Sequence, residues 1–422
     1  MPSHSQTPRE DRIEQQRTGL RILYLIVFGL ITVGVFNVYS STVYRNIEGG
    51  LNPYSYVFKQ LVFLIPGMLL FYVVKKIKPE TLARYSGAIS LFACALLVLV
   101  FAAGKTVNGA TRWIGIGPVS IQPSEVAKIP AIMWAAWYLS RLIDGGKRIT
   151  VFGEIKNILR RGNGFTLSSL KRIAAYFKPM WMPFCMAFLV ILQPDMGTAG
   201  MILIFPALMY VIAGMPVVEI ILGLIGAVSL FLVLALSSTY RRARLVVLWD
   251  PFSRASDLGY QTVQSLIAVG TGGIFGQGPG QGFSKFFYLP ESHTDFAFAV
   301  WCQECGLFGA LLIVATFMLF IYTGLRLAAR VNTTYRMLLV SGLTLLIGTQ
   351  ACINIAMVIG CFPVTGIPLP FISYGGTSLV INLTAVGMIA GAVEHSMKEE
   401  EMQQRRALAE YGPSSGMSNN FR

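Results

Sequence analysis

The sequence predicts an all-α polytopic membrane protein with about ten transmembrane helices and a long extracellular loop between spans seven and eight. The 422-residue chain is 54% hydrophobic and only 13% charged, whereas soluble domains carry about 25% charged residues. Apolar windows of about 20 residues, the length that crosses a ~30 Å hydrocarbon core, recur along the chain. Lys and Arg concentrate in alternate connections between these windows, as the positive-inside rule requires.

The apolar windows give the expected spans in order. They lie at 20–40, 53–74, 82–103, 124–143, 179–193, 197–213, 217–237, 296–323, 335–361 and 372–394. The fifth and sixth are short, and Gln193-Pro194-Asp195 separates them. Proline cannot donate a backbone hydrogen bond, so we expect the helix to break there.

Basic residues set the orientation. The segment before the first span, the connections at 75–78 and 326–336, and above all the connection at 141–178, with nine Lys and Arg, are predicted to be cytoplasmic. Residues 19–396 then form one membrane domain between flexible cytoplasmic tails at 1–18 and 397–422. The net charge of +14 fits anionic lipid headgroups. The basic residues are dispersed and lack an aromatic platform, so no nucleic-acid partner is expected.

The loop at 238–295 is the longest of the loops predicted to lie outside, and it is rich in aromatic residues, which disfavours disorder.

The chain contains no complete nucleotide-binding motif. "GKT" at 104–106 lacks the earlier glycine, and the glycine-rich 270–282 segment lacks a dinucleotide fingerprint. Cys302 and Cys305 have no second pair for zinc, and the chain has only three His. A zinc or histidine metal site is therefore not expected.

The stretch "KFFYLPESHTDFAF" (285–298) collects polar residues beside an apolar run. If Pro290 occupies the first turn of a helix, Glu291 and Asp295 share one helical face. Asp295 directly precedes the eighth span, and a partly desolvated carboxylate is a stronger base, suited to taking a proton from a hydroxyl group. The alternative is that Asp295 only caps the span.

Three further blocks carry polar groups near the outer surface. In "NGATRWIGIGPVSIQPSEVAK" (108–128), the Arg112 guanidinium suits a phosphate, pyrophosphate or lipid headgroup, while Glu125 and Lys128 can form a functional or merely structural ion pair. In "LQPDMGTAG" (192–200), Asp195 links two short helices, as a cap or as a supporting residue. Three Pro and three Gly in "CFPVTGIPLPFISYGGTS" (361–378) predict a re-entrant or cavity-lining loop.

These blocks, together with "GYQTVQSLIAVGTGGIFGQGPGQ" (259–281), resemble the signatures of the SEDS family (shape, elongation, division and sporulation). They occur in family order and, with the spans between them, cover most of the chain from about 20 to 394. "KFFYLPESHTDF", "PLPFISYGG" and "WDPF" are more similar to division members than to elongation members. Two positions depart from the family pattern: Gln303-Glu304 replaces the frequent Glu-Glu, and Gly280-Gln281-Gly282 replaces Gly-Gln-Ser.

The resemblance implies a peptidoglycan glycosyltransferase that polymerises lipid II, the undecaprenyl-pyrophosphate-linked disaccharide peptide, by inverting displacement at the outer face of the bacterial cytoplasmic membrane. It implies a class B penicillin-binding protein transpeptidase and other division proteins as partners, at the septum. Asp295 would be catalytic, and Glu125 and Asp195 supporting. The candidate substrate-binding residues are Arg112, Trp113, Lys128, Gln281, Lys285, Glu291, His293, Ser373 and Tyr374. A divalent cation, Mg²⁺ or Mn²⁺, could assist the leaving pyrophosphate, with no nucleotide cofactor and an unknown ligand set.

Two other functions are compatible with the same membrane spans and polar residues. A lipid II flippase would also need many spans with intramembrane charges, although no inverted repeat is visible. A non-catalytic division scaffold could use the 144–178 loop and the tails. Polymerisation of lipid II by the purified protein separates the three functions, because only the glycosyltransferase makes polymer.

Overall fold

Each of the ten predicted windows forms a helix in the computed structural model, which describes residues 8–107, 110–116, 119–160, 166–236, 242, 246–286 and 288–410. The helices are α1 (Pro8–Glu48), α2 (Ser55–Lys76), α3 (Pro79–Ala103), α4 (Pro123–Asp144), α6 (Leu167–Leu192), α7 (Met196–Ile212), α8 (Val217–Leu236), α11 (Ala297–Ala328), α12 (Thr334–Val358) and α13 (Gly376–Glu410). Within the described residues, seven of them are long and apolar enough to cross a membrane. The polytopic helical class is confirmed, and the count of ten spans stays a prediction.

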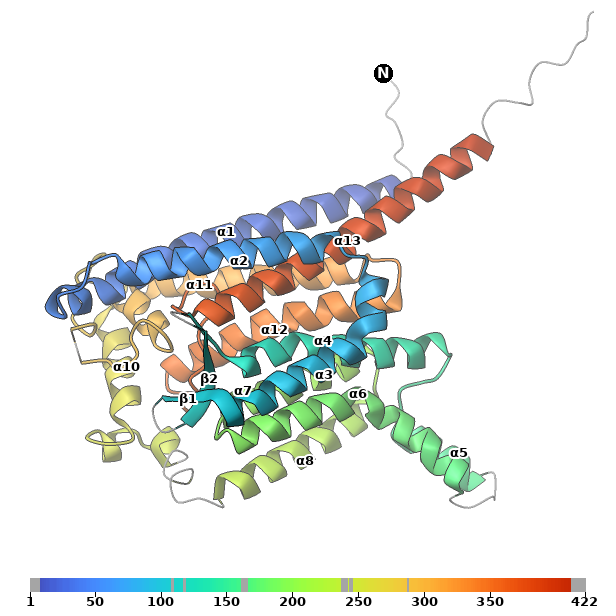
Figure 1. Ribbon diagram of the computed structural model, residues 1–422, viewed down its shortest axis with the longest axis horizontal. Coiled ribbons are helices and arrows are strands. Elements are labelled where there is room, and N and C mark those ends of the chain that lie inside the picture. The colour runs from blue at the N-terminus through green and yellow to red at the C-terminus, as the bar shows by residue number, and fades with distance from the viewer. Residues whose placement is uncertain are drawn as a thin grey trace, which may run out of the picture.

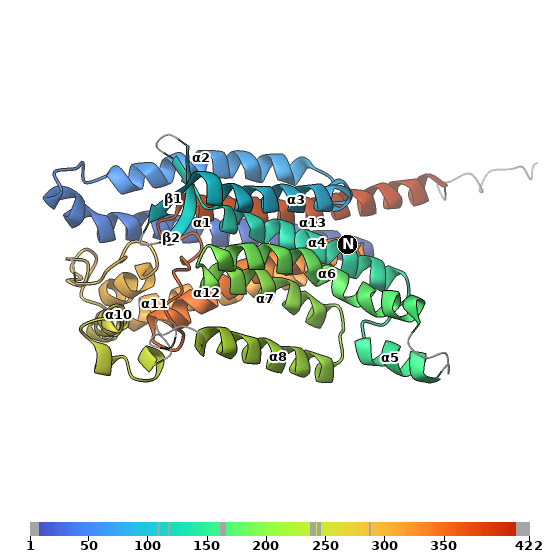
Figure 2. The ribbon, with the colours of Figure 1, turned by 60° about the horizontal axis from the view of Figure 1, so that its bottom comes forward.

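The long helices lie side by side, and smaller elements gather at one end of the bundle (Figures 1 and 2). We call this the site end. It holds α10 (Tyr260–Thr271), the 3₁₀ turn η1 (Phe252–Arg254), and the strands β1 (Gly104–Val107), β2 (Ala110–Ile116) and β3 (Val119–Ile121). Another short helix, α5 (Val151–Arg160), projects near the opposite end (Figure 1).

The three strands form an antiparallel sheet in the order β1-β2-β3, with Lys105 opposite Trp113. The all-α prediction missed this sheet. Its signal was available, because Asn108-Gly109 lies between the runs that form β1 and β2, and Asn-Gly is a strong hairpin signal.

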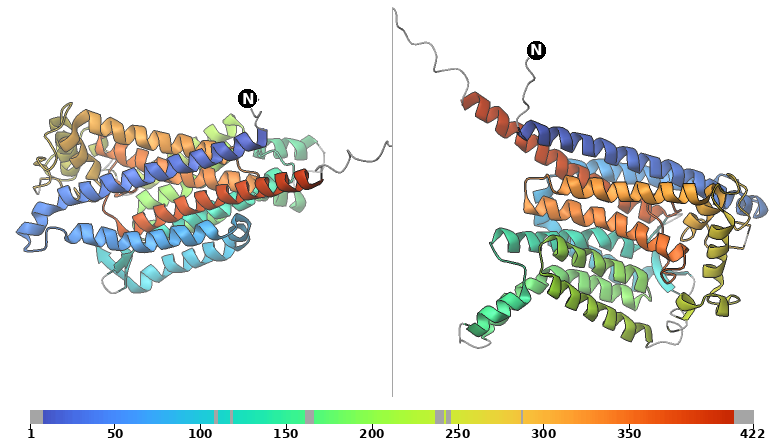
Figure 3. Two further views of the ribbon diagram at one scale, coloured as in Figure 1. Left: turned by 90° about the horizontal axis from the view of Figure 1, so that it is seen from above. Right: turned by 180° about the vertical axis from the view of Figure 1, so that it is seen from behind.

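The opposite end of the bundle, which we call the tail end, carries the beginning of α1 and the end of α13 (Figure 3). Both helices extend into the predicted flexible tails, so residues 8–18 and 397–410 are helical. An ion pair of 2.6 Å joins Arg17 to Glu401 across the two helices. Residues 1–7 and 411–422 of the predicted tails lie outside the described residues.

The middle of the bundle is formed by α12 and α13. Their most apolar windows are 72% and 78% buried, against 11% for α2, which lies on the outside of α13. Gly387 and Gly391 allow α13 to approach the α2 backbone at Phe71 and Lys75. Because α12 is buried on most sides, the polar side chains that it carries must find partners within the protein.

A break in α11 receives the glycine-rich segment that precedes it. Gly306 has φ of 65° and is not helical. Across this break, Gln277 N donates to Gln303 O at 3.0 Å and Leu307 N donates to Gly273 O at 2.9 Å. The loop backbone therefore replaces hydrogen bonds that the helix lacks, which is how irregular backbone is tolerated within a membrane bundle.

Candidate functional site

Asp295 lies in a turn before α11. Glu291 has φ of +52°, and its carbonyl accepts from Thr294 N at 3.1 Å and Phe296 N at 3.2 Å. The α11 helix begins only at Ala297, and its N-cap residue is Phe296 with no side-chain cap. The predicted helix start at Pro290 is therefore wrong, and so is the alternative that Asp295 caps the helix.

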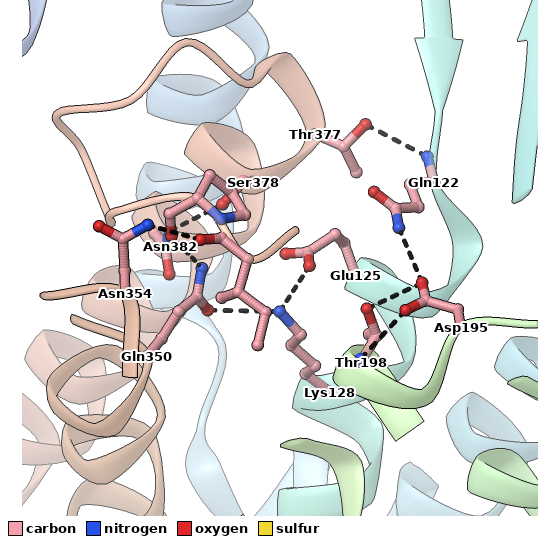
Figure 4. Close-up of polar contacts among 12 residues, drawn as sticks. Gln122, Glu125, Lys128, Asp195, Thr198, Gln350, Asn354, Thr377, Ser378 and Asn382 are labelled. Atoms are coloured by element: carbon pink, nitrogen blue, oxygen red, sulfur yellow. Dashed lines mark hydrogen bonds and ion pairs between the residues drawn. The ribbon is translucent and has the colours of Figure 1, made fainter. Parts of the chain in front are cut away.

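The backbone of Asp295 is held by α12. Asn354 Nδ2 donates to Asp295 O and to Ile367 O, each at 2.7 Å. One helical turn earlier, Gln350 Nε2 donates to Pro368 O at 3.0 Å. Figure 4 shows both amides among the polar contacts of this region. Two amides of one helix thus fasten the irregular 361–375 loop, and one of them also fixes Asp295.

The side chain of Asp295 has a different environment. No described residue forms a hydrogen bond or ion pair with its carboxylate, and a methyl group placed on Gly366 would lie 3.5 Å from its Oδ2. Burial, followed by the nearby negative charges of Glu291 and Asp195, raises the pKa of Asp295 to about 7. A carboxyl group with this pKa can both accept and release a proton near neutral pH.

Asp195 lies at the start of α7 and influences Asp295 electrostatically. Its carboxylate caps α7 by accepting from Thr198 N at 3.2 Å and Thr198 Oγ1 at 2.9 Å. It also accepts from Gln122 Nε2 at 3.3 Å, as Figure 4 shows. The helix break predicted at Pro194 is confirmed, and so is the interpretation of Asp195 as a helix cap.

Arg112, on β2, reaches the same turn. It donates from Nε to Gln193 O at 3.4 Å and from Nη2 to Pro194 O. Its Nη1 lies 4.0 Å from Asp195 Oδ1, and 31% of its side chain is exposed. Arg112 therefore keeps an accessible face that can meet a ligand anion.

The predicted pair of Glu125 and Lys128 forms on α4. Lys128 Nζ lies 2.5 Å from Glu125 Oε1 and 3.3 Å from Gln350 Oε1, and its side chain is 1% exposed. Gln350 joins this pair to the loop behind Asp295 (Figure 4). This geometry supports a structural role for the ion pair, because protein partners enclose the ammonium group.

His293, Tyr374 and Tyr56 form an aromatic cluster beside Asp295. The ring centroids of Tyr56 and His293 are 5.1 Å apart, and those of His293 and Tyr374 are 5.8 Å apart. Tyr374 N donates to His293 O at 2.9 Å. Burial lowers the pKa of His293 to about 4, so its ring is neutral at neutral pH. Ser373 acts locally, since its Oγ accepts from Leu369 N at 2.9 Å.

Three predicted binding residues lie apart from this group. Lys285 is buried, with Nζ 2.6 Å from Glu304 Oε1 and 3.0 Å from Ser40 Oγ. Gln281 is exposed in the glycine-rich segment. Trp113 is half-buried on β2, opposite Lys105. Among the residues that the structure describes, no ion pair or hydrogen bond joins any of the three to Asp295.

Sequence reasoning missed the polar side chains that position the site, which are Gln122, Gln350 and Asn354. It also gave no role to Glu304 and Ser40, which hold Lys285. The available signal was polarity inside apolar windows, since buried polar groups in spans are normally paired or functional. Gln350 and Asn354 also have the spacing of four residues that places two side chains on one helical face.

No group of three or more His, Cys, Asp or Glu side chains in the described part of the chain is arranged to hold a metal ion. Magnesium often binds through one or two carboxylates, with substrate phosphates completing its shell. The carboxylates of Asp295, Glu291 and Asp195, which influence one another electrostatically, are compatible with that weaker type of site.

Comparison with known proteins identifies the family of this chain. The family described as cell cycle protein FtsW/RodA/SpoVE matches residues 21–398. The chain is 34% identical over 372 residues to a probable peptidoglycan glycosyltransferase FtsW of Coxiella burnetii, covering 87% of this chain and 94% of the relative. It is 36% identical over 380 residues to stage V sporulation protein E of Bacillus subtilis, covering 89% and 97%.

Solved structures share the fold. The rod shape determining protein RodA of Thermus thermophilus superposes with a TM-score of 0.62 at 23% identity, covering 89% of this chain and 96% of that one. A chain from a peptidoglycan synthase complex gives a TM-score of 0.69 at 24% identity, covering 89% and 97%. With the match over residues 21–398, the chain belongs to the FtsW/RodA/SpoVE family, which confirms the SEDS resemblance.

Proposed function

We propose that this chain, a peptidoglycan glycosyltransferase of its family, polymerises lipid II with Asp295 as the general base. The observation that carries the proposal is the carboxylate of Asp295, which has no hydrogen-bond or ion-pair partner among the described residues, although its own backbone is firmly held. A partly desolvated carboxylate without an internal partner is available to accept a proton from a substrate.

In this proposal, the acceptor hydroxyl attacks the anomeric carbon of a sugar attached to undecaprenyl pyrophosphate. Asp295 takes the hydroxyl proton as the new carbon–oxygen bond forms. The bond from the anomeric carbon to pyrophosphate breaks, and pyrophosphate leaves with the electron pair. A single displacement inverts the anomeric centre. The accessible face of Arg112 provides positive charge where the leaving group develops negative charge.

We propose a divalent cation, Mg²⁺ or Mn²⁺, as the cofactor, and site carboxylates such as that of Glu291 would help to hold it. It would neutralise charge on the departing pyrophosphate. Chelation should lower the rate of polymerisation, and adding back Mg²⁺ or Mn²⁺ should restore it. A rate unchanged by chelator would remove the cation from the proposal.

We also propose the cellular setting from the family. The chain would act in the bacterial inner membrane, at the division septum, beside a class B penicillin-binding protein transpeptidase and other division proteins. Support comes from relatives named FtsW and from a solved relative within a peptidoglycan synthase complex. Fluorescent fusions that distribute evenly along growing cells would contradict the septal assignment.

The decisive experiment uses purified protein and labelled lipid II. Wild type should form glycan polymer, and Asp295→Asn should form none while remaining folded. Asp144→Asn is the matched control, because Asp144 lies at the other end of α4 and bonds Thr334. A flippase would move label between leaflets without polymer, and a scaffold would do neither. Normal polymer from Asp295→Asn would refute the assignment of the base.

A further inference from the structure

A cavity of about 340 Å³ lies at the site end, between the segment at 247–262, Pro290 and the segment at 362–364. It is separate from the polar contacts around Asp195 and Asp295, and none of the binding residues predicted from the sequence lines it. Its size is within the range of small-ligand sites.

The wall formed by α10 is held rigidly. Ser265 Oγ donates to Val358 O at 2.7 Å, which fastens α10 to the end of α12. Leu266 packs against Gly360, where an added methyl group would lie 3.4 Å from its Cδ2. Gly259 N donates to Arg254 O at 2.9 Å and closes the turn before the helix. The cavity is therefore preformed, which reduces the entropy cost of binding.

The chemistry of the described lining suits a sugar better than a phosphate. Among the described lining residues there is no Lys, Arg or His. Asp257, Tyr260, Gln261 and Thr262 supply hydroxyl, amide and carboxylate groups beside apolar side chains such as that of Phe362. The Tyr260 hydroxyl and the Gln261 amide have no hydrogen-bond partner among the residues that the structure describes.

The cavity and Asp295 are joined by two short segments. Pro290 lines the cavity and leads directly to the turn that holds Asp295. Val364 lines it as well, and two residues later Gly366 lies against the Asp295 carboxylate. The two segments that lead from the cavity to Asp295 are therefore only a few residues long, and they bring its lining close to the proposed base along the chain.

From these observations we infer that the cavity is the subsite for the acceptor saccharide, an N-acetylated amino sugar that carries the attacking hydroxyl. The inference rests on the proposed function. Tyr260 and Gln261 contact the sugar hydroxyl and amide groups, and the apolar wall receives the acetyl methyl group. The donor pyrophosphate binds elsewhere, at the exposed face of Arg112.

The test measures binding without catalysis. A soluble tetrasaccharide of alternating N-acetylglucosamine and N-acetylmuramic acid, lacking lipid and pyrophosphate, is titrated into purified Asp295→Asn protein by calorimetry. Tyr260→Ala and Gln261→Ala, each added to this background, should weaken binding at least ~10-fold, equivalent to ~1.4 kcal/mol. Ile267→Ala, an exposed position of α10 outside the cavity, should leave the Kd unchanged.

A second measurement uses the catalytically intact chain and separates the two claims. Tyr260→Ala should make shorter glycan than wild type from the same lipid II, because the acceptor is held less well. If wild type makes no polymer, the proposed function fails. If wild type polymerises and both cavity variants match it in Kd and glycan length, the subsite is wrong. Loss of tetrasaccharide binding in Arg112→Ala alone would also overturn it.

Discussion

At the scale of single residues, the chemistry depends on an electrostatic contrast between Asp295 and Arg112. Asp295 lies near the carboxylates of Glu291 and Asp195, whereas Arg112 contacts Asp195 only at 4.0 Å and keeps an exposed face. The negative charges around Asp295 favour the protonated form of its carboxyl group. The positive charge of Arg112 favours a bound anion. The proposed base and the proposed leaving-group site therefore prefer opposite charges at the site end.

The pH dependence of polymerisation follows from Asp295. Its pKa is raised to about 7, and the deprotonated form is the base. Activity should therefore be low at about pH 5, rise through about pH 7 and level off above it. Measuring kcat/KM across this range tests the expectation. A flat profile over the same range would contradict a titrating base of this pKa.

Substituting Arg112 should impair use of the pyrophosphate-bearing substrate. Hydrogen bonds to a charged group contribute roughly 1.5–3 kcal/mol, so Arg112→Ala should reduce kcat/KM about 10- to 100-fold, mainly through KM. Arg112→Lys keeps the charge and should recover part of the loss. Because Arg112 also bonds the 193–194 turn, the thermal midpoint must be measured alongside. An unchanged KM would remove Arg112 from the substrate site.

At the scale of elements, two helices have distinct tasks. Through Gln350 and Asn354, α12 holds the irregular 361–375 loop and the Asp295 backbone. At its break at Gly306, α11 binds the glycine-rich segment. Glu304 on the same helix pairs with Lys285, which lies between that segment and α11. Removing one partner of such a buried ion pair typically costs about 3–5 kcal/mol.

Gly306→Ala should destabilise the protein. A Cβ there would collide with the backbone of Gly276 and Ile274, and φ of 65° is unfavourable for alanine. Backbone strain of this kind costs about 1–3 kcal/mol before the collision is relieved, so the thermal midpoint in detergent should fall. Gly223→Ala on α8 is the control, since nothing lies within 4 Å of its added methyl. Equal midpoints for both variants would contradict the docking of the loop.

At the scale of the whole molecule, the described residues separate into a site end and a tail end (Figure 3). The site end holds Asp295, Arg112 and α10. The tail end holds ion pairs between distant segments, such as Arg336 with Glu399 at 2.6 Å and with Glu80 at 2.8 Å. A membrane that crosses the bundle places these two ends in different compartments.

Labelling in intact cells should separate these ends. In a variant whose native cysteines are replaced, Ser256→Cys, exposed at the site end, should react with a membrane-impermeant maleimide. Gln403→Cys, exposed near the end of α13, should react only after permeabilisation, as the distribution of basic residues predicts. Labelling of Gln403→Cys alone in intact cells would invert the topology and overturn the proposed function.

Much of this architecture is predictable from the sequence, because apolar windows and a single Pro194 break give local signals. The Asp295 block was also recognisable, but its turn was not. The turn combines a positive φ at Glu291 and a helix start at Ala297 with a hydrogen bond from Asn354, 59 residues after Asp295, and such a distant contact leaves no local signal. Likewise, Lys285 has the charge of a ligand-binding residue, and only the fold reveals that Glu304 already neutralises it.

The hydrogen bonds between the glycine-rich segment and the break in α11 limit how this region can change in evolution. Main-chain atoms make the joint, so outward-facing side chains such as Phe275, 79% exposed, are free to vary. The length of the segment is constrained, because one insertion or deletion between 273 and 278 would move the backbone amides away from the carbonyl groups that they bind. Evolution should therefore preserve the length of this stretch and its Gly276, where a Cβ would collide with Glu304 O, and should vary its outward-facing residues.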